Sequence, residues 1–245
     1  MLEQALILAG GLGTRFRSVR DDIPKGLAPV GGKPVLEHQI QALAQAGVSR
    51  VVLCVGYLYE QIEQHLGSGE RFGLELAYSV ETEALGTAGA VAHAKDLVQD
   101  SPFCVLNGDT LMPDLDFQSL FDRHEHTAAS VSMVVTPAPD AGAYGVLELG
   151  EDARRVTGYR EKAELGTDYS NAWISAGVYV FPYQIFDLIP SGRLVSMENE
   201  VFPKLLERNQ LIAAFPYHGF FGDMGTPSGY TRTDNYLSCC QESTP

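Results

Sequence analysis

Glycines and basic side chains follow the first apolar run of the chain, and together they could bind phosphate. The glycine-rich turn includes Leu8, Ala9, Gly10, Gly11, Gly13 and Thr14. Arg15 and Lys25 follow it. A turn without Cβ atoms lets backbone N–H groups approach a phosphate, and nearby cations neutralise its charge. Five basic and two acidic residues lie between positions 15 and 33, although the whole chain has a net charge of −14. The segment therefore predicts a local anion-binding site.

The spacing of the turn argues against two common nucleotide-binding loops. No G-x4-G-K-[ST] motif is present, so the turn is not a P-loop. Phe16 stands where a dinucleotide-binding loop would have its third glycine, which argues against NAD. The acidic balance of the chain also argues against binding to nucleic acid or to an anionic membrane, because the mean field repels phosphate.

Short apolar runs separated by amphipathic segments predict the elements that position this site. Strands are expected at 5–9, 51–55, 74–80 and 103–107, with a helix over 35–46, a pattern typical of a parallel α/β sheet. After residue 128 the sequence becomes β-rich, with runs at 129–135, 144–149, 154–159 and 172–181, which predicts added antiparallel strands. Asp109 lies two residues after the run at 103–107. Ligands gather at that edge of a parallel sheet, so Asp109 is a candidate ligand for Mg²⁺.

The block GGLGTRFRSVRDDIPKGLAPVGGKPVLEH (10–38) closely resembles the N-terminal signature of the sugar-1-phosphate nucleotidylyltransferases. The resemblance continues in family order through VLNGD (105–109), YREK (159–162), NAWISAGVYVF (171–181) and GDMGTP (222–227). It implies an α/β fold: one Rossmann-like, GT-A-like domain over 1–237 with a mixed, mostly parallel sheet flanked by helices. Residues 1–127 would form its nucleotide-binding half and 128–237 its sugar-phosphate-binding half, followed by a tail at 238–245. Such an enzyme transfers a nucleoside monophosphate from an NTP to a sugar 1-phosphate and releases pyrophosphate.

The resemblance also implies roles for individual residues. Arg15 and Lys25 would be the catalytic cations, the arginine on the triphosphate and the lysine between the reacting phosphates. Asp223 would join Asp109 in binding Mg²⁺. The residues expected to contact the sugar phosphate are Gly145, Glu161, Lys162 and Asn171. Ala163 stands where the family usually has proline, which leaves the conformation of that loop open.

The segment ETEALGTAG (81–89) follows a strand and opens a helix, so it should border the nucleotide base. Its LGTAG resembles guanylyltransferases of the mannose and heptose type. Guanine has N1–H and N2–H₂ groups, and the carboxylate of Glu81 or Glu83 could accept hydrogen bonds from them. A role for Glu83 in capping the helix is an equally weighted alternative. We therefore expect GTP as donor, with Glu83, Gly86 and Thr87 in the nucleotide site. On resemblance alone, the preferred acceptor is D-glycero-α-D-manno-heptose 1-phosphate, giving GDP-heptose for capsule or surface polysaccharide.

The sequence is also compatible with other functions. Within the family they are a mannose-1-phosphate guanylyltransferase or an amino-sugar-1-phosphate uridylyltransferase. Outside it they are a non-catalytic nucleotide-sugar sensor, or a glycosyltransferase using the DxD motif Asp114-Leu115-Asp116, although Asp116 is better placed as a helix N-cap. No apolar run reaches the ~20 residues that cross a bilayer, so we expect a cytoplasmic protein; a homo-oligomer is compatible with the sequence.

Overall fold

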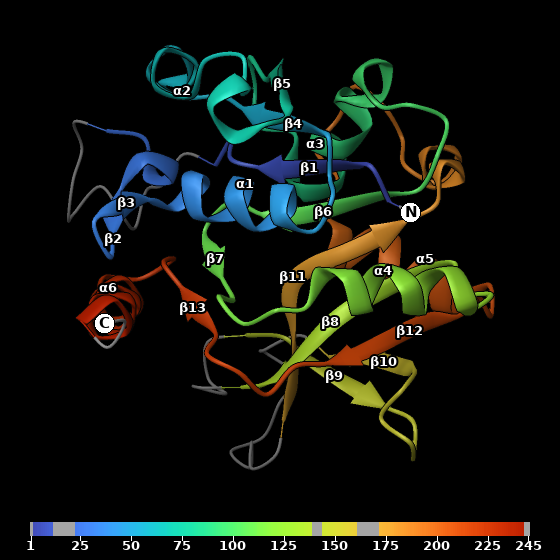
Figure 1. Cartoon of the computed structure of the whole chain (residues 1–245). Helices are drawn as coiled ribbons and strands as arrows, with labels where there is room; N and C mark the ends of the chain where they lie inside the picture. The colour runs from blue at the N-terminus through green and yellow to red at the C-terminus, as the bar shows by residue number, and fades with distance from the viewer. Residues whose placement is uncertain (1, 12–22, 139–143, 161–171, 243–245) are drawn as a thin grey trace.

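A computed structural model describes residues 2–11, 23–138, 144–160 and 172–242 of the 245-residue chain. Within these residues the main sheet has nine strands, in the order β10-β9-β11-β6-β1-β4-β5, with β8 beside β11 and β12 beside β8 (Figure 1). The strands are β1 Gln4–Leu8, β4 Arg50–Val55, β5 Glu75–Val80, β6 Phe103–Asn107, β8 Val131–Pro137, β9 Val146–Leu149, β10 Val156–Arg160, β11 Trp173–Phe181 and β12 Ile212–Pro216.

The sheet has a parallel half and an antiparallel extension. Strands β6, β1, β4 and β5 are parallel, and Leu8 lies opposite both Cys54 and Asn107, so neighbouring strands end at one level. Strand β11 runs antiparallel to β6, and β8 and β9 run antiparallel to β11. The predicted α/β fold with a mixed, mostly parallel sheet is therefore confirmed, and its parallel strands present a shared carboxyl edge.

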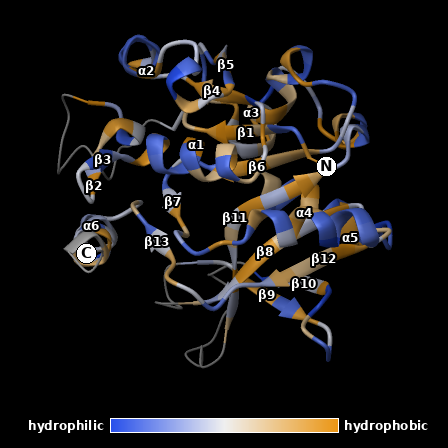
Figure 2. Cartoon of the chain, in the orientation of Figure 1, coloured by the Kyte–Doolittle hydropathy of each residue, from blue (hydrophilic) through white to orange (hydrophobic). Residues whose placement is uncertain are grey.

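Helices cover both faces of the sheet because both faces of its strands are apolar. Ile7 of β1 packs with Leu36 of α1, whereas its neighbour Leu6 packs on the opposite side with Val91 of α3, as the alternation of a strand requires. The helices on the first face are α1 Val35–Gln45, α2 Tyr59–Leu66 and α4 Phe117–His126, and those on the second are α3 Gly86–His93 and α5 Phe202–Glu207. Figure 2 shows apolar strands inside and hydrophilic outer helix surfaces.

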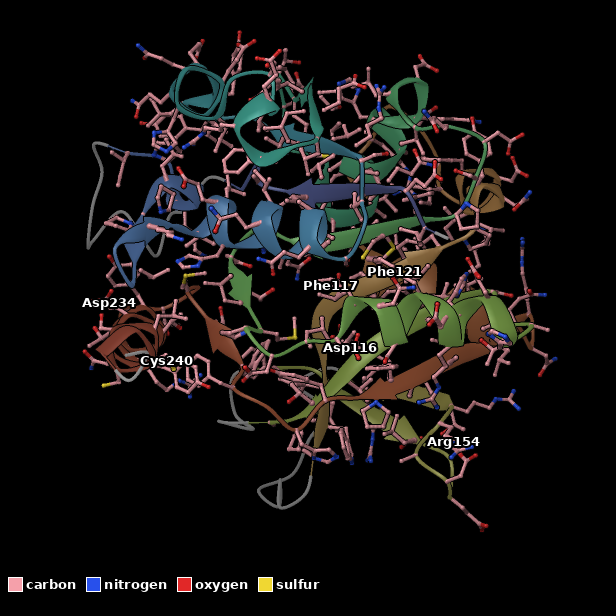
Figure 3. All side chains as sticks on the ribbon, viewed as in Figure 1. Asp116, Phe117, Phe121, Arg154, Asp234 and Cys240 are labelled. Atoms are coloured by element: carbon pink, nitrogen blue, oxygen red, sulfur yellow. The ribbon has the colours of Figure 1, made fainter. Side chains whose placement is uncertain are left out.

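Two small ribbons and a C-terminal helix complete the molecule. The ribbons are β2 Pro29–Val30 with β3 Lys33–Pro34, and β7 Thr110–Leu111 with β13 Gly222–Asp223. Helix α6, Pro227–Glu242, packs against both β2 and β13. Leu237 shares a small core with Val30 and Met224. The segment predicted as a tail from residue 238 thus continues α6 to Glu242, and Figure 3 labels Asp234 and Cys240 on this helix.

Within the described ranges, no helix combines the length and the apolar character that a membrane crossing needs.

Candidate active site

A cavity of about 660 Å³ opens at the carboxyl edge of the parallel strands. Its walls come from the segments that follow β1, β4, β5 and β6, together with Lys25. The predicted site residues that line it are Leu8, Ala9, Gly10, Gly11, Lys25, Glu83, Gly86, Thr87 and Asp109. Gly13, Thr14 and Arg15, also predicted for this site, lie outside the described residues. The described part of the glycine turn therefore shares one cavity with the lysine and the aspartate.

Lys25 and Asp109 form an ion pair in this cavity. Lys25 begins a single 3-10 turn, Lys25–Leu27, and its Nζ donates to Asp109 Oδ2 at 2.6 Å. The lysine side chain is 16% exposed and that of the aspartate 38%. The ammonium group is thus largely withdrawn from solvent, while the carboxylate remains open on one side. The catalytic lysine and the metal-binding aspartate predicted from separate segments thus lie in direct contact.

The second aspartate reaches Asp109 through a two-stranded ribbon. Asp223 of β13 lies opposite Thr110 of β7, and the Met224 backbone N–H donates to the Asp109 carbonyl at 2.9 Å. In Figure 1, β7 and β13 lie below β1 and β6, on the side where β1 ends. Pairing across the ribbon therefore brings together the backbones of two aspartates that are far apart in the sequence, although Asp109 lines the cavity and Asp223 does not.

The donor set here suits a hard cation. Two aspartates supply only oxygen ligands, and Mg²⁺ commonly binds one or two carboxylates while substrate phosphates and waters complete its shell. Within the described ranges, no group of three or more His, Cys, Asp and Glu side chains gathers to hold a metal by itself. The residues present therefore fit a cation that is shared with a phosphorylated substrate better than they fit a closed structural site.

Glu81 and Glu83 both line the cavity but differ in environment. Glu81 directly follows β5, is partly buried, and accepts a hydrogen bond from the Leu85 backbone N–H at 3.3 Å. Burial raises the pKa of its carboxyl, and the hydrogen bond and His93 offset this only in part. Glu83 is exposed. Of the two carboxylates that the sequence left open as acceptors for the base, Glu81 is the one held by a hydrogen bond and partly shielded from solvent.

Gly86 and Thr87 are held by a segment from the other half of the chain. Gly86 has φ +71°, and a Cβ there would lie 2.6 Å from the Val195 carbonyl oxygen, so glycine is required by both backbone conformation and close approach. Thr87 Oγ1 donates to Glu198 Oε2 at 3.1 Å and accepts from Met197 N at 2.8 Å. Thr87 therefore lines the cavity, but its hydroxyl anchors the turn.

Of the four residues expected to contact the sugar phosphate, the structure describes Gly145. Glu161, Lys162 and Asn171 lie outside the described residues, between the end of β10 and the start of β11. Gly145 is described, and the Tyr159 phenol occupies the space where a Cβ at Gly145 would project. Gly145 does not belong to the lining of the cavity. Its glycine is explained by this packing, and its predicted contact with the sugar remains a prediction.

Asn107 and Tyr144 are among the residues in or near the cavity that were not identified from the sequence. Asn107, the last residue of β6, lines the cavity, and its buried Oδ1 has no hydrogen-bond partner among the described residues. Tyr144 donates to Asp223 Oδ2 at 2.5 Å. The position of Asn107 beside Asp109 was a usable signal, because it ends the same strand. Nothing local in the sequence connects Tyr144 with Asp223.

The DxD motif has a structural use. Asp116 caps α4, since its Oδ1 accepts from the Ser119 backbone N–H at 2.9 Å, and Figure 3 labels it at the start of that helix. Asp114 Oδ2 accepts from the Tyr236 hydroxyl at 3.4 Å. Neither aspartate lines the cavity. The expected N-cap is confirmed, and the motif gives no support to a glycosyltransferase site.

The family described as Nucleotidyl transferase matches residues 4–238. The chain belongs to this family. Mannose-1-phosphate guanyltransferase beta-B of Xenopus laevis is 35% identical over 99% of this chain and 67% of its own length. Mannose-1-phosphate guanylyltransferase of Mycobacterium tuberculosis is 35% identical over 93% of this chain and 62% of its own length. The chain thus spans about two thirds of these relatives.

Solved structures agree with the family assignment. The crystal structure of HddC from Yersinia pseudotuberculosis has a TM-score of 0.80 and 29% identity, and the match covers 96% of this chain and all of that one. HddC has also been crystallised in complex with GMP-PN. The inositol-1-phosphate CTP transferase from T. maritima, at 20% identity and a TM-score of 0.79, supports the shared fold alone.

Proposed function

We propose that the protein is a sugar-1-phosphate guanylyltransferase that converts GTP and a sugar 1-phosphate to a GDP-sugar and pyrophosphate. The observation that carries the proposal is the meeting of Lys25, Asp109 and the glycine turn in one cavity, with Asp223 joined to Asp109 by the β7–β13 ribbon. A protein that only sensed nucleotide-sugars would not need this combination of a lysine, two candidate metal-binding aspartates and a phosphate-binding turn. The relatives named as guanylyltransferases support guanine as the base.

In the proposed reaction a phosphate oxygen of the sugar 1-phosphate attacks the α-phosphorus of GTP. A new P–O bond forms as the bond between the α-phosphorus and the α–β bridging oxygen breaks, and pyrophosphate leaves with the electron pair. The attacking phosphate is already ionised, so no general base is needed. The protein must bring two anions together and neutralise their charge, and electrostatic stabilisation of this kind is usually the largest catalytic contribution.

The predicted site residues would divide the work of this reaction among them. Backbone N–H groups of the turn around Gly10 and Gly11 would contact the triphosphate, and the Lys25 ammonium would lie between the reacting phosphates. Asp109 and Asp223 would bind Mg²⁺, which when bound withdraws charge from the phosphate oxygens and favours attack. Arg15 would hold the departing pyrophosphate, and Gly145, Glu161, Lys162 and Asn171 would hold the sugar phosphate, as the family resemblance implies.

For the base, we propose Glu81 as the residue that accepts hydrogen bonds from guanine. Its carboxyl lies in the cavity and is held by the Leu85 N–H. Glu81→Gln should reduce the preference for GTP over UTP, with Glu83→Gln as the matched control on the exposed rim. Because burial raises the pKa of Glu81, the KM for GTP should also rise on acidification at a higher pH than an exposed glutamate would give. An unchanged GTP/UTP ratio in Glu81→Gln would exclude this role.

The proposal also concerns the identity of the acceptor sugar. The sequence resemblance favours D-glycero-α-D-manno-heptose 1-phosphate, whereas curated relatives at about one third identity are named for mannose 1-phosphate. The two sugars share the manno configuration and differ beyond C5, so the substrate screen below includes both.

A pyrophosphate-release screen tests the proposed function. The purified protein is incubated with each of the four NTPs and a panel of hexose and heptose 1-phosphates, with and without Mg²⁺. GTP with a manno-configured 1-phosphate should give the highest rate, Mg²⁺ should be required, and Asp109→Ala should lose turnover while remaining folded. GDP-sugar binding without turnover under Mg²⁺ would instead identify a sensor, and retained turnover in Asp109→Ala would exclude the metal role.

A further inference from the structure

Both oxygens of the Asp223 carboxylate accept hydrogen bonds. The Gly225 backbone N–H donates to Oδ1 at 2.7 Å within the turn after β13. The Tyr144 hydroxyl donates to Oδ2 at 2.5 Å, from a residue 79 positions earlier in the chain. A carboxylate engaged on both oxygens is held in one orientation before any ligand arrives.

Tyr144 is itself held in place. Its ring makes an edge-to-face contact with Phe221, with the centroids 6.2 Å apart and an angle of 67° between the ring planes. Phe221 directly precedes β13, so the ring packs on the same strand whose aspartate its hydroxyl contacts. A carboxylate oxygen accepts hydrogen bonds, so the Tyr144 hydroxyl is the donor in its contact with Asp223 Oδ2.

The two aspartates differ in how their charge is balanced. Asp109 is paired with the Lys25 ammonium group at 2.6 Å. Among the described residues, the hydrogen-bond donors to Asp223 are a phenol and a backbone amide, which are neutral. Asp223 is thus oriented without being neutralised. A carboxylate in this state retains its attraction for a divalent cation and loses little conformational freedom on binding it.

We propose that Tyr144 is a positioning residue that orients Asp223 for a divalent cation. The inference rests on the metal role proposed above for Asp109 and Asp223. Hydrogen bonds to metal-ligating groups typically change metal affinity by about 10–100-fold. Tyr144 also stands immediately before Gly145 and β9, in the half of the chain expected to bind the sugar phosphate. Its hydroxyl therefore connects the segment before β9 to the aspartate of β13, within that same half.

The test compares Tyr144→Phe with Tyr236→Phe. The first removes the hydroxyl and keeps the ring against Phe221. The control removes another tyrosine–aspartate hydrogen bond, from Tyr236 to Asp114, an aspartate that has no proposed role in binding the cation. Binding of Mn²⁺ is measured by electron paramagnetic resonance, with the full chain alone and with a non-transferable GTP analogue. Thermal unfolding and binding of the analogue in EDTA are measured in parallel.

In Tyr144→Phe the Kd for Mn²⁺ should rise about 10–100-fold, with thermal unfolding and metal-free nucleotide binding unchanged, and Tyr236→Phe should match the wild type. In turnover assays the Mg²⁺ concentration for half-maximal rate should rise while kcat at saturating Mg²⁺ is retained.

Unchanged Mn²⁺ affinity in Tyr144→Phe, or equal losses of Mn²⁺ affinity in both variants, would overturn the proposal. So would a loss accompanied by weaker metal-free nucleotide binding, which indicates general disruption. Because Mn²⁺ binding is read without catalysis, a wild-type chain that binds Mn²⁺ but releases no pyrophosphate would overturn the proposed function and leave this inference standing.

Discussion

Replacing Lys25 by methionine separates its chemistry from its packing. Methionine keeps an unbranched apolar stem of similar length and removes the ammonium group that lies 2.6 Å from Asp109. The lysine side chain is only 16% exposed, so its charge acts in a site largely shielded from water. Loss of one preorganised donor to a developing oxyanion costs about 10²–10³ in kcat, or about 2.7–4 kcal/mol. We expect a loss in that range for Lys25→Met.

Stability should change far less than catalysis. The Asp109 carboxylate is 38% exposed, so it stays hydrated when its partner is removed, and ion pairs at this exposure contribute up to about 1 kcal/mol. We therefore expect the free energy of unfolding to fall by about 1 kcal/mol and the stabilisation of the transition state by about 3 kcal/mol. A catalytic loss that exceeds the stability loss in this way identifies a catalytic cation.

Pyrophosphate release under steady-state conditions and urea unfolding measure the two effects. An interaction made only in the transition state lowers kcat and kcat/KM equally, so KM should hold steady. Lys33→Met is the control, because Lys33 is an exposed lysine of the same block whose Nζ donates to Gln41 Oε1 at 3.3 Å. A rate loss below about tenfold in Lys25→Met, or an equal loss in Lys33→Met, would refute the reasoning.

Two further predictions concern stability. Gly86→Ala should lower the free energy of unfolding by about 2–4 kcal/mol, because a left-handed φ and a 2.6 Å approach to a carbonyl oxygen both oppose a Cβ. Gly192→Ala, with φ +73° and open space around it, should cost only about 1–2 kcal/mol in the same urea titration, and equal costs would remove the argument from contact. Glu37→Gln tests a buried carboxylate that accepts from Arg71 and His65 at 2.7 Å each. Burial alone raises the pKa of Glu37, but those two partners together lower it below 4.5. The ionised form therefore stabilises the fold above that pH, so the variant should be about 1–2 kcal/mol less stable at neutral pH. The difference should shrink as the pH falls through the lowered pKa, and a difference independent of pH would contradict the assignment.

Local signals predicted the nucleotide side of the site well. The strand ending at Leu8, the strand ending at Asn107 and the glycine turn follow from alternation of apolar residues and from backbone geometry, which act over a few positions. Parallel strands then end at a common edge, so residues after them converge without further information. The contact of Lys25 with Asp109 does not belong to this group, because the family resemblance implied a role only for each residue separately and the structure shows the two side chains paired.

What only the tertiary structure decided lies in pairings between distant segments. The hydroxyl of Thr87, read from the sequence as a nucleotide contact, is taken up by Glu198 and the Met197 N–H from the other half of the chain. Asp223 gains its orientation from Tyr144, and residues 238–242 become part of α6. Hydropathy and residue spacing carry information about an element and its immediate neighbours. The orientation of one carboxylate, in contrast, depends on which polar group of a distant segment comes within hydrogen-bond distance, and only the packing of those two segments fixes that.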